Sequence, residues 1–112
     1  QEIFRDIKGV TVFTEPNSNY FSNHWLSCIL IDKSITGFSR EDLRLQLEKD
    51  TIESRPLWKP MHLQPVFKDC DYYGGTVAEG LFKDGLCLPS GSNLTDEDRE
   101  RIEMSIMKVL KS

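Results

Sequence analysis

The sequence lacks the features typical of membrane, secreted and nucleic-acid-binding proteins. No apolar run approaches the roughly 20 residues that a membrane-spanning helix needs. The first ten residues have neither the basic region nor the apolar region of a signal peptide. The formal net charge is -4, whereas general nucleic-acid binders carry an excess of basic residues. We therefore expect no signal peptide, no membrane and no nucleic acid as a partner.

Cysteine is scarce, and its spacing argues against two common roles. The three cysteines, Cys28, Cys70 and Cys87, are an odd number at wide intervals. This spacing is neither a disulfide framework nor a zinc-binding pattern. Free thiols are typical of a reducing compartment, so we expect a cytoplasmic protein with unpaired cysteines and no bound metal.

Motifs for catalysis are also missing. There are only two histidines, His24 and His62, and no spacing pairs either of them with a nucleophilic cysteine or serine. No glycine-rich phosphate loop is present, and the glycines of YYGG at residues 72–75 are typical of a turn. The residues alone therefore predict no catalytic machinery.

The composition is that of one small globular domain. The chain has 112 residues, of which 38% are hydrophobic and 29% are charged. It opens on QEIFRDIKGVTVF without an initiator methionine. We therefore expect a piece of a longer protein.

Four stretches have the pattern of short strands. The clearest is HWLSCILID at residues 24–32, which is nearly all apolar and predicts a buried strand. Residues 9–15 alternate apolar and polar side chains and stop at a proline. TIESRPL, at residues 51–57, is β-like but must end at Pro56, and LCLP at 86–89 is a short apolar strand.

Helix signals are strong at residues 38–50. Ser39 can cap the first turn and Asp42 sits three residues later. Phe38 and Leu43 are spaced for a hydrophobic staple across the helix start.

Two more helices are predicted in the second half of the chain. In residues 75–85, Thr76 and Glu79 are spaced as a capping box, and Gly85 can close the end. The last helix, 95–111, starts at Thr95 and has three acidic residues in its first turn, where the helix dipole favours anions. Its apolar stripe consists of Ile102, Ile106, Val109 and Leu110.

This order of strands and helices predicts an α+β fold. We expect a small, mostly antiparallel sheet of three or four strands, with helices packed on one face.

Residues 54–67, SRPLWKPMHLQPVF, combine cationic and aromatic side chains on a proline-rich segment. Arg55 offers a bidentate contact to phosphate, Lys59 a point charge, Trp58 a stacking surface and His62 a hydrogen bond. This set suits a ligand with phosphate and a ring. The alternative is structural: a solvated arginine and lysine beside a partly buried tryptophan, with a hydrogen-bonded histidine.

The same stretch carries a family resemblance. ESRPLWKPMHLQPVF, followed by YYGGTVAEGLFKDGLCLPSGSNLTDEDRERI, resembles the C-terminal part of the DegT/DnrJ/EryC1/StrS family. These are pyridoxal-phosphate-dependent aminotransferases that act on nucleotide-linked keto-sugars. SNHWLSCILID at residues 22–32 is similar to the family as well, so the resemblance runs from Ser22 to Ile106.

The resemblance implies a domain of the aspartate-aminotransferase fold, type I. Residues 1–21 would be a connecting segment and first strand, and residues 22–112 the smaller, C-terminal domain. The family's cofactor-binding lysine lies in the large domain, and no lysine here has its context. Pyridoxal phosphate would thus belong to the parent enzyme, and this chain alone would bind none and be inactive.

The resemblance also implies ligands and partners. Arg55, Trp58 and His62 would contact the diphosphate and sugar of a nucleotide-sugar, with Lys59 as a weaker candidate. Asn23 and His24, with Trp25, would lie near the mouth of the site. The parent enzyme would use an amino-acid donor such as glutamate, form a homodimer, and serve surface-polysaccharide or modified-sugar biosynthesis.

A second hypothesis needs no chemistry. The chain could be a standalone α+β module that holds a phosphorylated or nucleotide-sugar ligand through residues 55–62. A closed, polar surface would favour the module, whereas an exposed apolar flank would favour a domain that packs on a larger enzyme.

Overall fold

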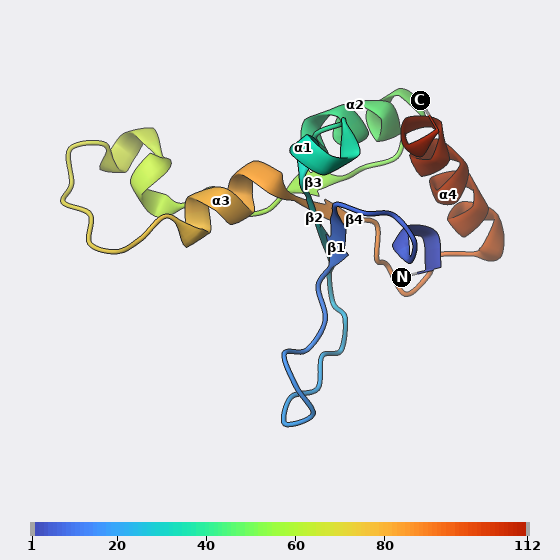
Figure 1. Ribbon diagram of the computed structural model, residues 1–112, viewed down its shortest axis with the longest axis horizontal. Helices are drawn as coiled ribbons and strands as arrows, with labels where there is room; N and C mark the ends of the chain where they lie inside the picture. The colour runs from blue at the N-terminus through green and yellow to red at the C-terminus, as the bar shows by residue number, and fades with distance from the viewer. Residues whose placement is uncertain (1, 112) are drawn as a thin grey trace.

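A computed structural model describes residues 2–111 and contains one four-stranded antiparallel sheet in the order β1-β2-β4-β3 (Figure 1). The predicted α+β fold is confirmed. The strands are β1 (Val10–Val12), β2 (Ser27–Ile31), β3 (Arg55–Pro56) and β4 (Gly85–Leu88). The α-helices are α1 (Lys33–Thr36), α2 (Arg40–Lys49), α3 (Val77–Asp84) and α4 (Asp96–Leu110). Three 3-10 turns are η1 (Glu2–Phe4), η2 (Met61–Leu63) and η3 (Pro65–Phe67).

Helices α2 and α4 cover one face of the sheet, as predicted. Because side chains alternate between faces along a strand, Ile29 and Ile31 of β2 both point into this layer. They meet Leu43 and Leu47 of α2 and the apolar stripe of α4. The buried core is Phe4, Ile29, Ile31, Leu43, Leu47, Ile52, Leu86, Ile106 and Val109.

The predicted caps of α2 and α4 are confirmed. The Ser39 hydroxyl accepts from the Asp42 amide, and the Asp42 carboxylate accepts from the Ser39 amide at 2.7 Å. Thr95 and Asp98 form the same reciprocal pair at the start of α4. Such boxes arise from residues three positions apart, so the sequence is enough to locate them.

The capping box predicted for α3 is wrong. Thr76 makes no side-chain capping hydrogen bond, and the Glu79 carboxylate is instead bonded to His62. Gly85 does follow the helix, but its backbone is extended, because it is already the first residue of β4. Helix α1, which the sequence patterns missed, is capped by Asp32, whose carboxylate accepts from the Ser34 amide at 3.0 Å.

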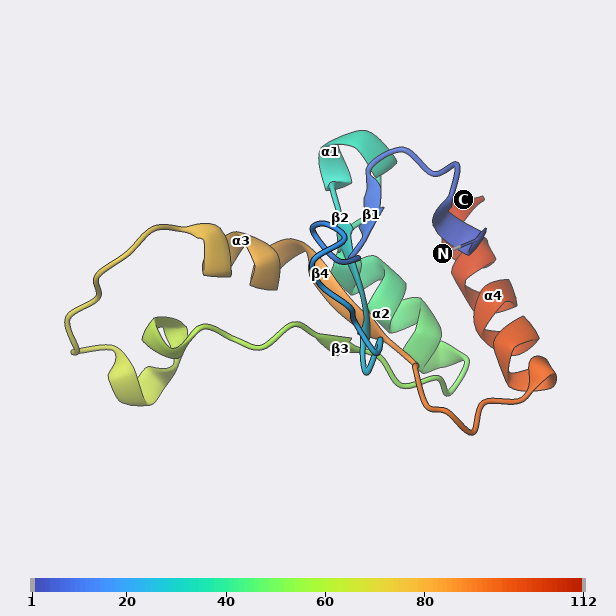
Figure 2. The same cartoon turned by 90° about the horizontal axis from the view of Figure 1, so that it is seen from below.

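Two segments extend from this compact part, and the molecule measures 47 × 36 × 28 Å along its principal axes. The first is the β1–β2 connection, residues 13–26, drawn in blue at the bottom of Figure 1. The second is the arm, residues 57–76, which carries η2 and η3 and projects away from α2 and α4 in both views (Figure 2). Within residues 2–111, no helix is both long and apolar enough to cross a membrane.

The ends of α2 and α4 are joined by a polar cluster around Asp50. Lys108 Nζ donates to both carboxylate oxygens of Asp50 at 2.9 and 3.0 Å, and the Gln46 amide donates at 3.1 Å. The Ser105 hydroxyl, Lys108 and Gln46 together lower the pKa of Asp50 to about 2. Arg101 of α4 adds hydrogen bonds to the backbone oxygens of Asp50 and Thr51, which close the end of α2.

We predict that Asp50→Asn destabilises the protein in a pH-dependent way. A carboxyl whose folded pKa is depressed stabilises the fold fully above its unfolded pKa of about 3.9, and that contribution is lost as the pH falls through about 2. The difference in free energy of unfolding between wild type and variant should therefore be largest at neutral pH and shrink between about pH 4 and pH 2. Denaturant unfolding followed by circular dichroism measures it. The matched control is Asp71→Asn in the exposed part of the arm, and an equal loss at every pH would contradict the assignment.

Candidate ligand-binding site

His62 lies on the arm and connects it to α3. Its Nε2–H donates to Glu79 Oε1 at 2.6 Å, and its ring stacks on Tyr72 with centroids 3.8 Å apart and planes 19° apart. The side chain is 17% exposed. The Tyr72 hydroxyl in turn donates to the backbone oxygen of Gly75. One ring nitrogen is thus used internally, and Nδ1, which makes no hydrogen bond within residues 2–111, is left for a ligand.

Arg55 lies at the edge strand β3 with its guanidinium in solvent. It forms an ion pair with Glu53 at 2.6 Å, and the two side chains are 78% and 72% exposed. Glu53 and Arg55 are two residues apart on extended chain, so both side chains leave the same face. A water-exposed pair of this kind contributes about 0–1 kcal/mol, so a phosphate could replace Glu53 at little cost.

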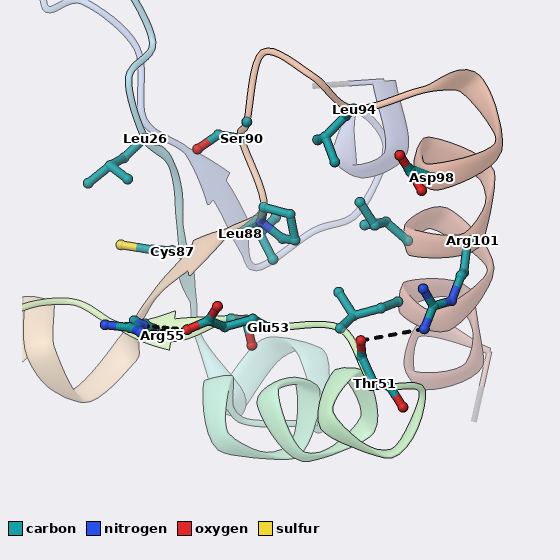
Figure 3. A pocket seen from close by; sticks show the side chains of 15 residues that line it. Leu26, Thr51, Glu53, Arg55, Cys87, Leu88, Ser90, Leu94, Asp98 and Arg101 are labelled. Atoms are coloured by element: carbon teal, nitrogen blue, oxygen red, sulfur yellow. Dashed lines mark hydrogen bonds and ion pairs between the residues drawn. The ribbon is translucent and has the colours of Figure 1, made fainter.

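The cleft that Arg55 borders is open and has a volume of about 460 Å³ (Figure 3). It lies between β3, β4 and the start of α4, and both guanidinium groups that line it, Arg55 and Arg101, have a partner already. Figure 3 shows Arg55 beside Glu53 at one end and Arg101 beside Thr51 at the other, with Cys87 and Ser90 above. The lining therefore combines two guanidinium groups with the carboxylates of Glu53 and Asp98 and with apolar side chains.

Trp58 and Lys59 lie on the arm and are both exposed. The indole is 71% exposed, so it is not packed in the core formed by the described residues. The backbone oxygen of Lys59 accepts from the Gln64 side-chain amide at 3.2 Å, which stiffens the turn after Pro60. The arm therefore exposes an aromatic surface, Trp58, and a positive charge, Lys59.

Asn23 and His24 lie in the β1–β2 connection. Asn23 Oδ1 accepts from the Trp25 amide at 3.0 Å, and His24 adopts a positive φ of 51°, which is uncommon for a side-chain-bearing residue. His24 Nε2 is 3.7 Å from Glu15 Oε1. The Ser22 amide, a hydrogen-bond donor to the same carboxylate, is the main reason that the pKa of Glu15 is lowered.

His24 lines a second cleft, of about 450 Å³, whose walls are mostly apolar. Leu26 lines both clefts, so the two adjoin along this residue. The predicted site residues thus fall into three places. Arg55 borders the first cleft, His24 the second with Asn23 beside it in the chain, and Trp58, Lys59 and His62 lie on the arm.

Sequence reasoning missed the partners of these residues. The ion pair of Glu53 with Arg55 could have been predicted from the sequence, because residues two apart on a strand share a face. Tyr72 and Glu79 had none, because their contact with His62 depends on how the arm folds back on α3.

Neither a cluster of metal-ligating side chains nor a buried lysine is found among residues 2–111. Within residues 2–111, no group of three or more His, Cys, Asp or Glu side chains could hold a metal ion. A lysine that forms a Schiff base needs desolvation or a neighbouring charge. Every lysine of the described chain is exposed: Lys8, Lys33, Lys49, Lys59, Lys68, Lys83, Lys108 and Lys111.

Comparisons with known proteins agree with this fold. The model of the DegT/DnrJ/EryC1/StrS aminotransferase family matches residues 1–107. EpsN of Bacillus subtilis (strain 168), whose name describes a pyridoxal phosphate-dependent aminotransferase, is 45% identical over 85 residues, which are 72% of this chain and 21% of EpsN. GDP-perosamine synthase of Escherichia coli O157:H7 is 30% identical over 93 residues, 83% of this chain and 24% of that protein.

Among solved structures, a DegT DnrJ EryC1 StrS aminotransferase from Brucella abortus superposes with a TM-score of 0.74 at 26% identity. The match covers 99% of this chain and 28% of that chain. This chain therefore spans about a quarter of the length of the relatives it matches.

We predict that Glu79→Ala loosens the arm without unfolding the domain. Losing the partner of His62 removes one charge-assisted hydrogen bond, roughly 1 kcal/mol at a partly exposed site. The amides of Leu63 and Gln64, which are bonded within η2, should then exchange with solvent about five- to tenfold faster. Hydrogen exchange measured by mass spectrometry tests this. Glu103→Ala on the exposed side of α4 is the control, and unchanged exchange in the arm would refute the anchoring role.

Proposed function

The chain belongs to the DegT/DnrJ/EryC1/StrS aminotransferase family, and from this membership we propose that it is the substrate-contacting domain of a larger enzyme. That enzyme is a pyridoxal-phosphate-dependent aminotransferase that transfers an amino group from an amino-acid donor to a nucleotide-linked keto-sugar. Residues 1–21 are its connecting segment and first strand, and residues 22–112 form its smaller, C-terminal domain. The relative named GDP-perosamine synthase supports a nucleotide-linked sugar as substrate.

The observation that carries the proposal is the apolar surface of the two projecting segments. Independent monomeric domains rarely leave large contiguous apolar patches in water. Here most of the exposed large apolar side chains lie on these segments: Phe13, Tyr20, Phe21 and Trp25 on the β1–β2 connection, and Trp58, Met61, Leu63, Val66, Tyr72 and Tyr73 on the arm. The surface is the opposite of the closed, polar one that a standalone module would have.

The occupant of this surface is the rest of the enzyme. Relatives of this chain are about four times as long, so they contain some three quarters of their length beyond the matched region. A large domain packed on the arm and the β1–β2 connection would cover their aromatic side chains. It would also turn the two open clefts into walls of one enclosed site.

The cofactor belongs to that large domain in this proposal. When bound, pyridoxal phosphate supplies the amino-group carrier that no side chain can replace. No lysine of the described chain is buried, so none fits the cofactor-binding role. The chain alone should therefore be inactive.

The residues of this chain bind and orient the sugar nucleotide. The Arg55 guanidinium exchanges Glu53 for the diphosphate, to which it presents two parallel donors. Trp58 stacks on a ring or closes an apolar wall, His62 uses Nδ1 toward a hydroxyl, and Lys59 adds a charge. Asn23 and His24 contact the ligand from the second cleft. The parent enzyme acts in the cytoplasm as a homodimer, in amino-sugar or surface-polysaccharide biosynthesis.

The coding sequence upstream of Gln1 gives a direct test. We expect an open frame that encodes a large domain with a cofactor-binding lysine, and the purified full-length protein should show the absorbance of a bound pyridoxal Schiff base. A start codon immediately before Gln1 would exclude the aminotransferase and leave the binding module.

We predict that Arg55→Ala in the full-length enzyme raises KM for the sugar nucleotide by about ten- to a hundredfold. A charge-assisted hydrogen bond is worth about 1.5–3 kcal/mol, and each 1.4 kcal/mol corresponds to a factor of ten. KM for the amino donor should stay within about twofold. Steady-state kinetics with each substrate varied in turn measures both, with Arg99→Ala on the outer side of α4 as the matched control. Equal effects on both substrates would contradict the role of Arg55.

A further inference from the structure

Two cysteines face each other across the centre of the sheet. Cys28 of β2 is the direct partner of Cys87 of β4 in the antiparallel register. Their Sγ atoms are 3.5 Å apart, and both residues are free thiols. The odd count and wide spacing of cysteines in the sequence gave no sign of this pair, which exists only because β2 and β4 are neighbours.

The hydrogen-bond pattern identifies the type of pair. The Phe13 amide donates to the Cys28 oxygen at 3.0 Å, and the Asp32 amide donates to the Gly9 oxygen, so Cys28 directs its backbone groups toward β1. Since backbone groups alternate sides along a strand, those of Cys28 do not bond to β4. Cys28 and Cys87 are therefore a non-hydrogen-bonded pair.

This geometry suits a covalent bridge. In a non-hydrogen-bonded antiparallel pair the Cα atoms are about 4.5 Å apart and the side chains approach most closely. Disulfides span Cα separations of about 4.4–6.8 Å, so a pair of this type falls at the short end of that range. Closing the bridge needs the sulfur atoms to approach to about 2.05 Å, which side-chain rotation and a small twist of the two strands can supply.

The two thiols differ in access. Cys87 is 8% exposed, and burial raises the pKa of its thiol to about 11, so it stays protonated at neutral pH. Cys28 is half-buried and lines the second cleft, through which a small oxidant can reach its sulfur. Cys70, on the exposed arm, is outside this pair.

We propose that Cys28 and Cys87 form a reversible cross-strand disulfide when the protein meets a peroxide. The Cys28 thiolate attacks one peroxide oxygen, the O–O bond breaks, and Cys28 becomes a sulfenic acid while hydroxide leaves and takes a proton as water. Cys87 then loses its proton as its sulfur attacks the Cys28 sulfur, and a second water leaves. Two thiols are thus oxidised by two electrons and one peroxide is reduced.

The pair lies where a bridge would affect ligand binding, a consequence that rests on the proposed function. Cys28 lines the second cleft, Cys87 lines the first, and Arg55 is the direct partner of Cys87 on β3. The bridge would draw β2 toward β4 at the boundary between the two clefts. We expect the oxidised enzyme to bind its sugar nucleotide less tightly.

Peptide mapping of the full-length protein tests the disulfide. The protein is treated with hydrogen peroxide, free thiols are alkylated, and it is digested with trypsin without reductant. Cleavage after Lys8, Lys33, Lys83 and Arg99 places the two cysteines on peptides 9–33 and 84–99. We expect these peptides joined, with the loss of two hydrogen atoms, and separated again by dithiothreitol.

Variants decide between this pair and its alternatives. The joined peptide should persist in Cys70→Ser and vanish in both Cys28→Ser and Cys87→Ser. If Cys28 is oxidised to a sulfinic acid with no joined peptide in folded protein, or if it joins Cys70 instead, the proposal is overturned.

Kinetic measurements distinguish the proposed disulfide from the proposed aminotransferase function. Peroxide should raise KM for the sugar nucleotide several-fold in Cys70→Ser, and dithiothreitol should restore it, while Cys70→Ser/Cys87→Ser stays unchanged. A joined peptide with an unaltered KM would overturn only the expected effect on ligand binding, and the disulfide itself would stand. An absence of aminotransferase activity in the reduced protein would overturn the proposed function, and the joined peptide would still decide the disulfide.

Discussion

The alternation of side chains across one antiparallel sheet determines the rest of this structure. On β2 and β4, Ile29, Ile31 and Leu86 face α2 and α4 and form the core. Residues next to them along each strand face the other way. Cys28, Cys87 and Arg55, which are direct partners across β2, β4 and β3, therefore form one row on that opposite face. A slip of the register by one residue would exchange the two sets, burying a guanidinium and exposing the core. The core thus fixes the position of Arg55, although this residue does not contribute to it.

Helices α2 and α4 close one face of the sheet over the core. Two helices with reciprocal caps, joined through Asp50 and Lys108, close the buried layer. The β1–β2 connection and the arm have no such layer, yet they carry most of the exposed aromatic side chains. The arm is held by a few contacts of one residue: His62 is hydrogen-bonded to Glu79 and stacked on Tyr72. A segment so weakly tied to its own domain can adapt to a neighbouring surface, which suits a wall of a site shared between domains.

Sequence patterns predicted the features that depend on neighbours along the chain and missed those that depend on the fold. The predicted caps at Ser39 and Thr95 and the apolar stripe of α4 depend on residues a few positions apart in the chain, and all are present. The box at Thr76 had the same spacing but failed, because His62, 17 residues away from Glu79, took its carboxylate. The Cys28–Cys87 pair, 59 residues apart, depends on strand order alone. For Arg55 the sequence predicted a phosphate contact, which stays a prediction, and the spacing that would have indicated its ion pair with Glu53 was not used.

In the proposed function, Glu53 would prepare the exposed guanidinium of Arg55 for a phosphate. A free guanidinium on a long side chain loses rotamer freedom when it binds, at a cost of about 2 kcal/mol. Glu53 already restricts the guanidinium of Arg55 through contacts of 2.6 and 2.7 Å to one carboxylate oxygen. Because the pair is almost fully exposed, its own contribution is at most about 1 kcal/mol. A diphosphate that offers two charge-assisted hydrogen bonds exceeds this in a desolvated site. In the proposed function, Glu53 would therefore orient Arg55 without competing strongly for it, and its weak hold on the guanidinium would favour the exchange for a phosphate.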